Sequence, residues 1–127
     1  MRNTATFFAA LADVNRLRLL YLMQEGEICV CYLQGVLQTN QPKVSRHLAY
    51  LRKAGLVEAR REGKWMYYRL AKMDKGLETI IREALKHIGG EAQIKQDDRR
   101  LKQISCCPSR YGLSSPEMNG KHSELAA

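Results

Sequence analysis

Residues 39–70 constrain the fold most, because they specify both ends of a helix and the hairpin that follows it. Thr39 and Asn40 are preferred helix-capping residues, and proline at position 42 suits a first helical turn. Glycine at position 55 is a typical helix end. Between these ends, apolar residues recur at the i, i+4 and i+7 spacing of one buried helical face, namely Val44, Leu48 and Leu51. The segment predicts a helix with one apolar stripe and a polar surface elsewhere.

The residues after this helix predict a β-hairpin. LVEARR and WMYYRL are rich in β-branched and aromatic residues, and the turn EGK between them contains Gly63. Ahead of the helix, residues 32–37 show a short apolar helical pattern, joined to it by QTN. Two short helices with a tight connection make a helix-turn-helix, and a hairpin directly after the second makes it winged. We expect a mainly α-helical fold with a small β-hairpin, a winged helix-turn-helix.

Further helical patterns flank this unit on both sides. Residues 4–12 are apolar nearly all round, which predicts a helix buried on more than one side. A second helix follows, and Gly26 is its expected end. Residues 76–88 have the most regular amphipathic spacing in the chain. The winged unit is therefore expected to lie between helices at both ends of the domain.

The chain length of 127 residues allows one domain with a modest core. Weaker helical character resumes after Gly89 and Gly90 and continues as far as residue 104. The composition then changes toward Ser, Pro, Gly and Asn. We predict one folded domain over residues 1–104, and a largely disordered, cysteine-containing tail over residues 105–127.

Positive charge is concentrated on the winged unit. The formal net charge is +8, and residues 40–64 hold seven basic residues against Glu58 and Glu62, a net of +5. Such a density attracts polyanions, of which nucleic acid is the commonest in the cytoplasm; the alternative is a solvated basic surface. No apolar run approaches the roughly 18 residues needed to span a bilayer. The N-terminus makes a poor signal peptide, so we expect a cytoplasmic protein with no membrane partner.

The exposed side of the basic helix provides the expected DNA contacts. Its first turns would reach base edges in a major groove, where cations and short hydrogen-bonding groups are favoured. Phosphates take most protein–DNA contacts, so we assign them the cations Lys43, Arg46, Arg52 and Lys53 on the helix and Arg60, Arg61 and Lys64 on the hairpin. The base-reading candidates are Gln41, Ser45 and His47. The plainer alternatives are capping for Gln41 and packing at the domain edge for His47.

Four cysteines occur as two close pairs, Cys29/Cys31 and Cys106/Cys107. The cytoplasm keeps thiols reduced, so the pairs favour a soft metal or metalloid, or redox sensing, over structural disulfides. On a regular helix Cys29 and Cys31 would lie about 200° apart, whereas residues i and i+2 of an extended segment point the same way. Chelation by both therefore requires a non-helical entry to the helix at residues 32–37. The alternatives are small core residues for the first pair and inert tail residues for the second.

Catalytic motifs do not accompany these cysteines. A thiol oxidoreductase would need Cys-X-X-Cys near a βαβ pattern, and the sequence contains no P-loop, no HExxH and no Ser/His/Asp set. We therefore expect a protein that is not an enzyme and uses no organic cofactor. A redox-sensing regulator and a constitutive DNA-binding protein remain alternatives to a metalloid sensor.

The segments ADVNRLRLLYLM and EICVCYLQGVLQTNQPKVSRHLAYLRKAGLVEARREGKWMYYRL resemble the ArsR/SmtB family of metal-sensing winged-helix repressors. The resemblance is strongest to the arsenic-responsive members and covers roughly residues 4–90. It implies a homodimer held by the helices at residues 4–12 and 76–88. It also implies that the dimer binds double-stranded operator DNA and releases it when trivalent arsenic or antimony binds cysteine thiolates.

One departure from the family pattern affects the expected thiol site. Gln34 stands where many arsenic-responsive members carry a third cysteine. Three arrangements stay open: Cys106 or Cys107, most plausibly of the other subunit, supplies the third ligand; each pair binds separately; or only one pair functions. All four cysteines are therefore candidate ligands. The family's zinc site on the last helix is not expected, because position 90 is glycine.

Overall fold

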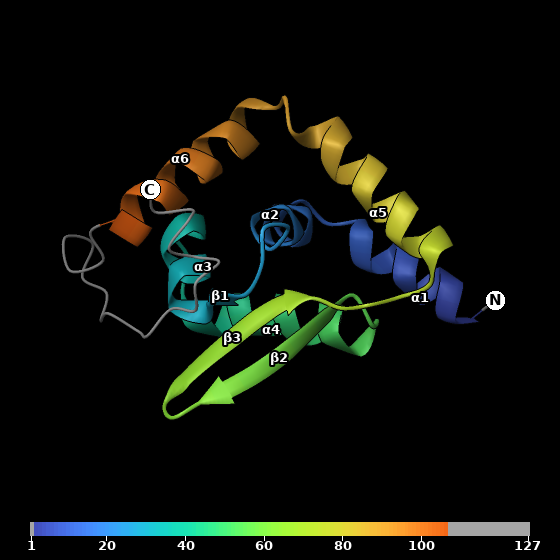
Figure 1. Ribbon diagram of the computed structural model, residues 1–127, viewed down its shortest axis with the longest axis horizontal. Helices are drawn as coiled ribbons and strands as arrows, with labels where there is room; N and C mark the ends of the chain where they lie inside the picture. Colours follow the sequence, from blue (N-terminus) through green and yellow to red (C-terminus); the bar gives the residue numbers. More distant parts are fainter. Residues whose placement is uncertain (1, 107–127) are drawn as a thin grey trace.

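The computed structural model describes residues 2–106 of the chain. In chain order the elements are α1 (Arg2–Leu11), α2 (Val14–Leu22), β1 (Ile28–Cys29), α3 (Val30–Leu37), α4 (Gln41–Lys53), β2 (Val57–Glu62), β3 (Trp65–Leu70), α5 (Lys75–Ile88) and α6 (Ala92–Cys106). The hairpin of β2 and β3 projects from the helical part of the molecule (Figure 1). The mainly α-helical, winged helix-turn-helix fold predicted from the sequence is confirmed.

Helix α4 begins and ends where the sequence predicts. Asn40 is its N-cap, and the Asn40 side-chain oxygen accepts a hydrogen bond of 3.0 Å from the backbone N–H of Lys43. The turn from α3 requires a left-handed residue, which is Gln38 with φ of 55°. Gly55 follows the helix with φ of 82°, a conformation that favours glycine. The predicted apolar stripe, made of Val44, Leu48 and Leu51, is fully buried.

The sheet has three strands in the order β1-β3-β2, all antiparallel. The predicted hairpin pairs Val57 with Leu70 and Glu62 with Trp65. Gly63, with φ of 60°, supplies the positive φ that a two-residue hairpin turn needs. Strand β1 was not predicted, because two residues are too few to show the alternation typical of a strand. It pairs with β3 and thereby joins the segment before α3 to the wing.

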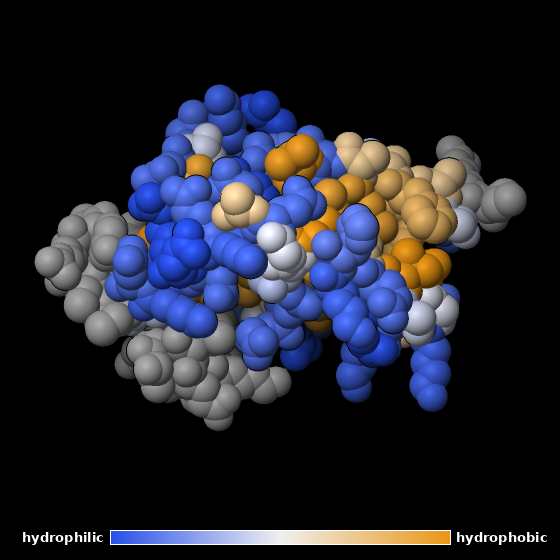
Figure 2. Space-filling view, turned by 90° about the horizontal axis from the view of Figure 1, so that it is seen from above, coloured by the Kyte–Doolittle hydropathy of each residue, from blue (hydrophilic) through white to orange (hydrophobic). Residues whose placement is uncertain are grey.

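The first helix differs from the prediction that it is buried on more than one side. One face of α1, with Phe7 and Ala10, packs against the core, whereas Phe8 is 48% exposed. The prediction was wrong for the single chain, because apolar residues on the other face of α1 have no cover there. Figure 2 shows apolar surface gathered at the end of the molecule that α1 and α5 occupy. Helix α2 also ends earlier than expected, at Leu22 rather than near Gly26.

Helix α6 is longer and better packed than the weak helical pattern after residue 90 indicated. Its apolar residues Ile94, Leu101 and Ile104 are buried, and the helix packs against α2 and α3 (Figure 1). It continues two residues beyond the predicted domain boundary at residue 104. The rest of the predicted tail, residues 107–127, lies outside the described residues. Within residues 2–106, no helix combines the length and apolar character needed to cross a bilayer.

Candidate thiol site and DNA-binding surface

The thiols of Cys29 and Cys31 meet at the junction between β1 and α3. Cys29 ends the strand in an extended conformation, with φ of −69° and ψ of 140°, and is the N-cap of the helix. Cys31 lies in the first turn of α3. Their Sγ atoms are 2.9 Å apart. The structure therefore has the non-helical entry that shared ligation requires, although α3 begins at Val30 instead of residue 32.

Close contact and burial separate the acidities of the two thiols. Cys29 is fully buried and Cys31 is partly exposed. A hydrogen bond from the Cys31 thiol lowers the pKa of Cys29 below its ordinary value, although burial opposes this shift. The same hydrogen bond, reinforced by burial, raises the pKa of Cys31. Cys29 is therefore the thiol of the pair that ionises first, and a chelated ligand must displace the proton that Cys31 keeps.

Two buried tyrosines border the thiol pair. Burial, followed by the charges of the two cysteines, raises the pKa of Tyr32 in α3. Tyr67 in β3 pairs with Cys29 across the sheet, and burial raises the pKa of Tyr67 to about 12. Both phenols therefore stay neutral at physiological pH. Sequence reasoning missed Tyr67 as a site residue, because only the pairing of β1 with β3 brings it to the thiols.

The third ligand expected from the sequence is not among the described side chains. No group of three or more His, Cys, Asp or Glu side chains that could hold a metal ion occurs in the described part of the chain. The backbone of Cys106 forms the last residue of α6. Cys107 lies outside the described residues. The contribution of this second pair stays a prediction.

The outer face of α4 carries most of the predicted DNA-contacting residues. Those with exposed side chains are Gln41, Lys43, Ser45, Arg46, Arg52 and Lys53. His47 differs: its side chain is 23% exposed, and its Nδ1 atom lies 3.9 Å from Oδ1 of Asp13. The guanidinium of Arg16 lies 4.1 Å from the centre of the Tyr50 ring, so α2 contacts α4 at Tyr50. The exposed candidates form one continuous polar side of the helix.

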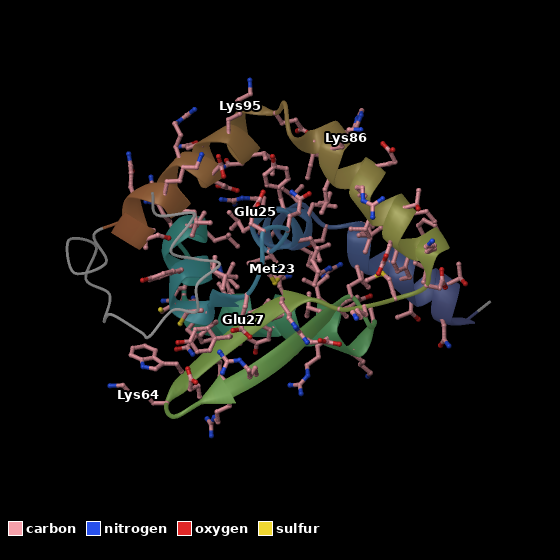
Figure 3. The ribbon with its side chains drawn as sticks, viewed as in Figure 1. Met23, Glu25, Glu27, Lys64, Lys86 and Lys95 are labelled. Atoms are coloured by element: carbon pink, nitrogen blue, oxygen red, sulfur yellow. The ribbon has the colours of Figure 1, made fainter. Side chains whose placement is uncertain are left out.

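The three predicted cations on the wing have different surroundings. Arg60 donates hydrogen bonds of 2.8 Å from Nε and 2.7 Å from Nη2 to the carboxylate of Glu27. Arg61 and Lys64 are exposed, and the Lys64 ammonium lies 5.1 Å from the centre of the Trp65 ring. Figure 3 shows Lys64 at the tip of the hairpin and Glu27 between the hairpin and the helices. The Arg60 side chain is also 44% exposed, but its guanidinium is engaged by Glu27 and lies 3.4 Å from the carboxylate of Glu62.

This arrangement defines a winged helix-turn-helix protein whose thiol pair lies at the start of the first helix of the helix-turn-helix. The chain belongs to the ArsR family: the family described as "Bacterial regulatory protein, arsR family" matches residues 13–59. The "Arsenic resistance transcriptional regulator ArsR1" of Pseudomonas putida is 55% identical over 64 residues, which are 50% of this chain and 50% of that protein. The "Arsenical resistance operon repressor" of Bacillus subtilis is 44% identical over 79 residues, 61% of this chain and 73% of that protein.

The fold is also similar to solved structures. The homodimeric winged helix-turn-helix DNA-binding domain of a Mycobacterium bovis protein is 33% identical, with a TM-score of 0.59. The similarity covers 72% of this chain and 86% of that domain. The chain spans about half the length of the first curated relatives that it matches. Family and fold are therefore shared with these proteins.

Proposed function

We propose that the protein is a transcriptional repressor that binds double-stranded operator DNA as a homodimer and releases it when trivalent arsenic or antimony binds cysteine thiolates. The observation that carries this proposal is the 2.9 Å approach of the Cys29 and Cys31 sulfurs. Two relatives whose names refer to arsenic or arsenical resistance support arsenic as the inducer. Soft thiolates are the protein ligands that suit such thiophilic centres.

Ligation at this position would act on the junction of two elements. Each sulfur–arsenic bond replaces a hydroxyl group of arsenous acid, and the thiol proton leaves with it as water. Metal–thiolate bonds are about 2.3 Å long, so an atom bonded to both sulfurs at an open angle holds them farther apart than 2.9 Å. Cys29 belongs to the sheet and Cys31 to α3, which packs against α4. Binding therefore shifts the sheet relative to the helix-turn-helix, and the coupling to DNA affinity is reciprocal.

The proposed DNA-binding surface is the exposed side of α4 with the outer part of the wing. Gln41 and Ser45, near the start of α4, are exposed where a recognition helix reaches base edges. His47 is retained as a third base-reading candidate on the same helix. The exposed cations of α4 would contact phosphates, and Arg61 and Lys64 would contact the flanking backbone.

The proposed dimer interface is the uncovered apolar surface on α1 and α5. Apolar residues with exposed side chains recur on and just after α1 at i, i+3, i+4 and i+7, namely Ala5, Phe8, Ala9 and Ala12. Ile80 on α5 is also exposed. A contiguous apolar patch of this kind marks an interaction surface. The homodimeric state of the M. bovis relative supports a second copy of the chain as its partner.

The tail pair remains part of the proposed thiol chemistry. Helix α6, which ends at Cys106, packs against α3, the helix that begins at the thiol pair. This packing supports a contribution of Cys106 or Cys107 to the same site. Separate binding by the two pairs, or function of one pair alone, gives different stoichiometries of arsenic per chain.

A thiol redox sensor is the second candidate function. The short sulfur–sulfur distance and the lowered pKa of Cys29 favour attack by its thiolate on a peroxide, which has to reach this buried sulfur past the partly exposed Cys31. That step oxidises the sulfur to a sulfenic acid and reduces the peroxide to water. The Cys31 thiol would then displace a second water to form a disulfide.

Release of DNA under controlled redox conditions tests the proposal. A duplex selected from random sequence for binding to the protein is titrated with wild type, Cys29→Ser, Cys31→Ser and Cys106→Ser, with a phosphine reductant present. Arsenite or antimonite should release the duplex from the wild-type protein but not from Cys29→Ser or Cys31→Ser. Full release of the duplex from Cys29→Ser would mean that Cys106 and Cys107 are the sensing pair. Release by peroxide alone, without a reductant, would favour the redox function.

A further inference from the structure

Three residues form one row across the three-stranded sheet and connect the thiol site to the wing. Tyr67 in β3 pairs with Cys29 in β1 on one side and with Arg60 in β2 on the other. Directly paired residues project from the same face of a sheet. The guanidinium of Arg60 accordingly lies 4.7 Å from the centre of the Tyr67 ring. The row therefore extends from the buried thiol to the outer strand of the wing.

An ion pair also connects Arg60 to the segment just before Cys29. Both bonds of the Arg60 guanidinium to Glu27, at 2.8 and 2.7 Å, reach a carboxylate only two residues before Cys29. Glu27 is 8% exposed and the Arg60 side chain 44%, so the carboxylate of this pair is shielded from water and the guanidinium is open to it. Bidentate arginine–carboxylate pairs are geometrically specific as well as strong. The wing strand β2 is thus bonded directly to the segment that carries the first thiol.

A second ion pair on the same hairpin provides a contrast. Arg69 donates to Glu58 at 2.8 Å, and the two side chains are 61% and 45% exposed. This pair joins β2 to β3 within the wing. Surface pairs of this kind contribute little. The Glu27–Arg60 pair differs because it joins the wing to another part of the chain.

We infer that the Glu27–Arg60 ion pair transmits ligand binding at Cys29 to the wing, which makes Arg60 a positioning residue. The inference rests on the proposed function and adds the route by which the thiol site acts on DNA. A ligand that spreads the two sulfurs displaces β1 relative to α3. Glu27 moves with β1, and Arg60, which binds Glu27 through Nε and Nη2, carries β2 with it. The wing then leaves the position in which Arg61 and Lys64 meet the DNA backbone.

The test compares Glu27→Gln with the matched control Glu58→Gln in the full-length protein. Both changes remove one carboxylate from an arginine pair, but only the first breaks the bond to the thiol segment. The measurement is the ratio of operator affinities without and with phenylarsine oxide, a compound that bridges two neighbouring thiols. Glu58→Gln should keep the wild-type ratio. Glu27→Gln should lower it by roughly fivefold or more, the size of a typical allosteric coupling, while its DNA-free affinity for phenylarsine oxide is unchanged.

The other outcomes separate the inference from the proposed function. An unchanged affinity ratio in Glu27→Gln would show that the ion pair does not transmit ligand binding to the wing. A loss of phenylarsine oxide binding in Glu27→Gln would also overturn the inference, because the ion pair would then only hold the thiols in place. If arsenite is inactive on wild type but phenylarsine oxide releases DNA, the inducer is an organic trivalent arsenical instead of the inorganic ion, and transmission is still measured. If neither compound releases wild type, both are wrong. If Glu27→Gln does not fold, Arg60→Gln replaces it as the test variant and Arg61→Gln is its control. Each of these two variants loses one cation of the wing, but only Arg60→Gln breaks the ion pair with Glu27.

Discussion

Arg18 on α2 donates two hydrogen bonds to Asp97 on α6, from Nε at 2.8 Å and from Nη2 at 2.9 Å. The Asp97 side chain is only 1% exposed. The side-chain amide of Gln93 donates a further bond of 2.9 Å to it. A buried carboxylate with three donors fixes the position of the helix that carries it. This pair, together with the apolar contacts of α6, makes the last helix an integral part of the domain.

Removal of Asp97 should therefore destabilise the domain. Asp97→Ala leaves the largely buried Arg18 without its partner, and the loss of one member of a buried pair costs about 3 kcal/mol. The neighbouring Asp98 forms an exposed pair with Lys102 at 3.2 Å. Asp98→Ala should cost at most about 0.5 kcal/mol. Urea denaturation followed by circular dichroism measures both, and equal losses in the two variants would contradict the structural role of Asp97.

The sequence predicted the winged unit well, because its signals are local. The cap at Asn40, the apolar stripe and the glycine turns each act within a few residues. Helix α6 and strand β1 depend on partners far along the chain, since Arg18 and Asp97 are 79 positions apart. A pattern of charges in one segment does not reveal which distant charge it meets.

The candidate site was predictable to a similar extent. The spacing of Cys29 and Cys31 specified the geometry that shared ligation needs, and the structure has that geometry. The residues around the thiols were not predictable, because Tyr67 and Arg60 reach them only through the register of the sheet. Arg60 was assigned to phosphate from its charge alone. Its bond to Glu27 could not be seen without the fold.

The N-cap of α4 offers a way to separate stability from DNA affinity. The Asn40 side chain accepts the backbone hydrogen bond of Lys43, so Asn40→Ala should cost about 1 kcal/mol of unfolding free energy. Asn40→Asp keeps the cap, because asparagine and aspartate cap helices about equally well. Its negative charge at the start of the recognition helix should nevertheless weaken DNA binding. Parallel urea and anisotropy titrations measure the two effects, and normal DNA affinity in Asn40→Asp would argue against entry of this helix end into a groove.

The exposed apolar face of α1 should be essential for dimer formation. Phe8→Glu puts a charge at a large apolar side chain of that helix that is 48% exposed. If this face is the centre of an interface, the change costs at least about 2 kcal/mol, or roughly thirtyfold in the dimer dissociation constant. Ala92→Glu adds the same charge at an exposed alanine of α6 and should have no such effect. Sedimentation equilibrium distinguishes them, and an intact Phe8→Glu dimer would place the interface elsewhere.

The unequal acidities of the thiol pair predict a pH-dependent signal. In a Cys106→Ser, Cys107→Ser background, the thiolate of Cys29 should form below the pKa of about 8.5 of a free cysteine, because Cys31 donates a hydrogen bond to it. Its thiolate fraction is thus raised at neutral pH. Cys31→Ala removes the side-chain donor but keeps the burial and the backbone hydrogen bonds of residues 31 and 32, so the pKa of Cys29 should be higher than in the intact pair. Ultraviolet absorbance of the thiolate measures both curves, and identical midpoints would mean that the two sulfurs do not share a proton.

The two neighbouring arginines of strand β2 should differ in their contribution to DNA binding. Arg61 is exposed, so Arg61→Ala should reduce the slope of log affinity against log salt by about 1, the value for one lost phosphate contact. The guanidinium of Arg60 is already bound to Glu27, and Arg60→Ala should therefore change that slope by less. The salt dependence distinguishes a phosphate contact from a positioning effect, because counterion release follows only the number of phosphates neutralised. Equal slopes of log affinity against log salt in the two variants would mean that Arg60 contacts a phosphate as Arg61 does. The ion pair with Glu27 would then have to open when the protein binds its operator.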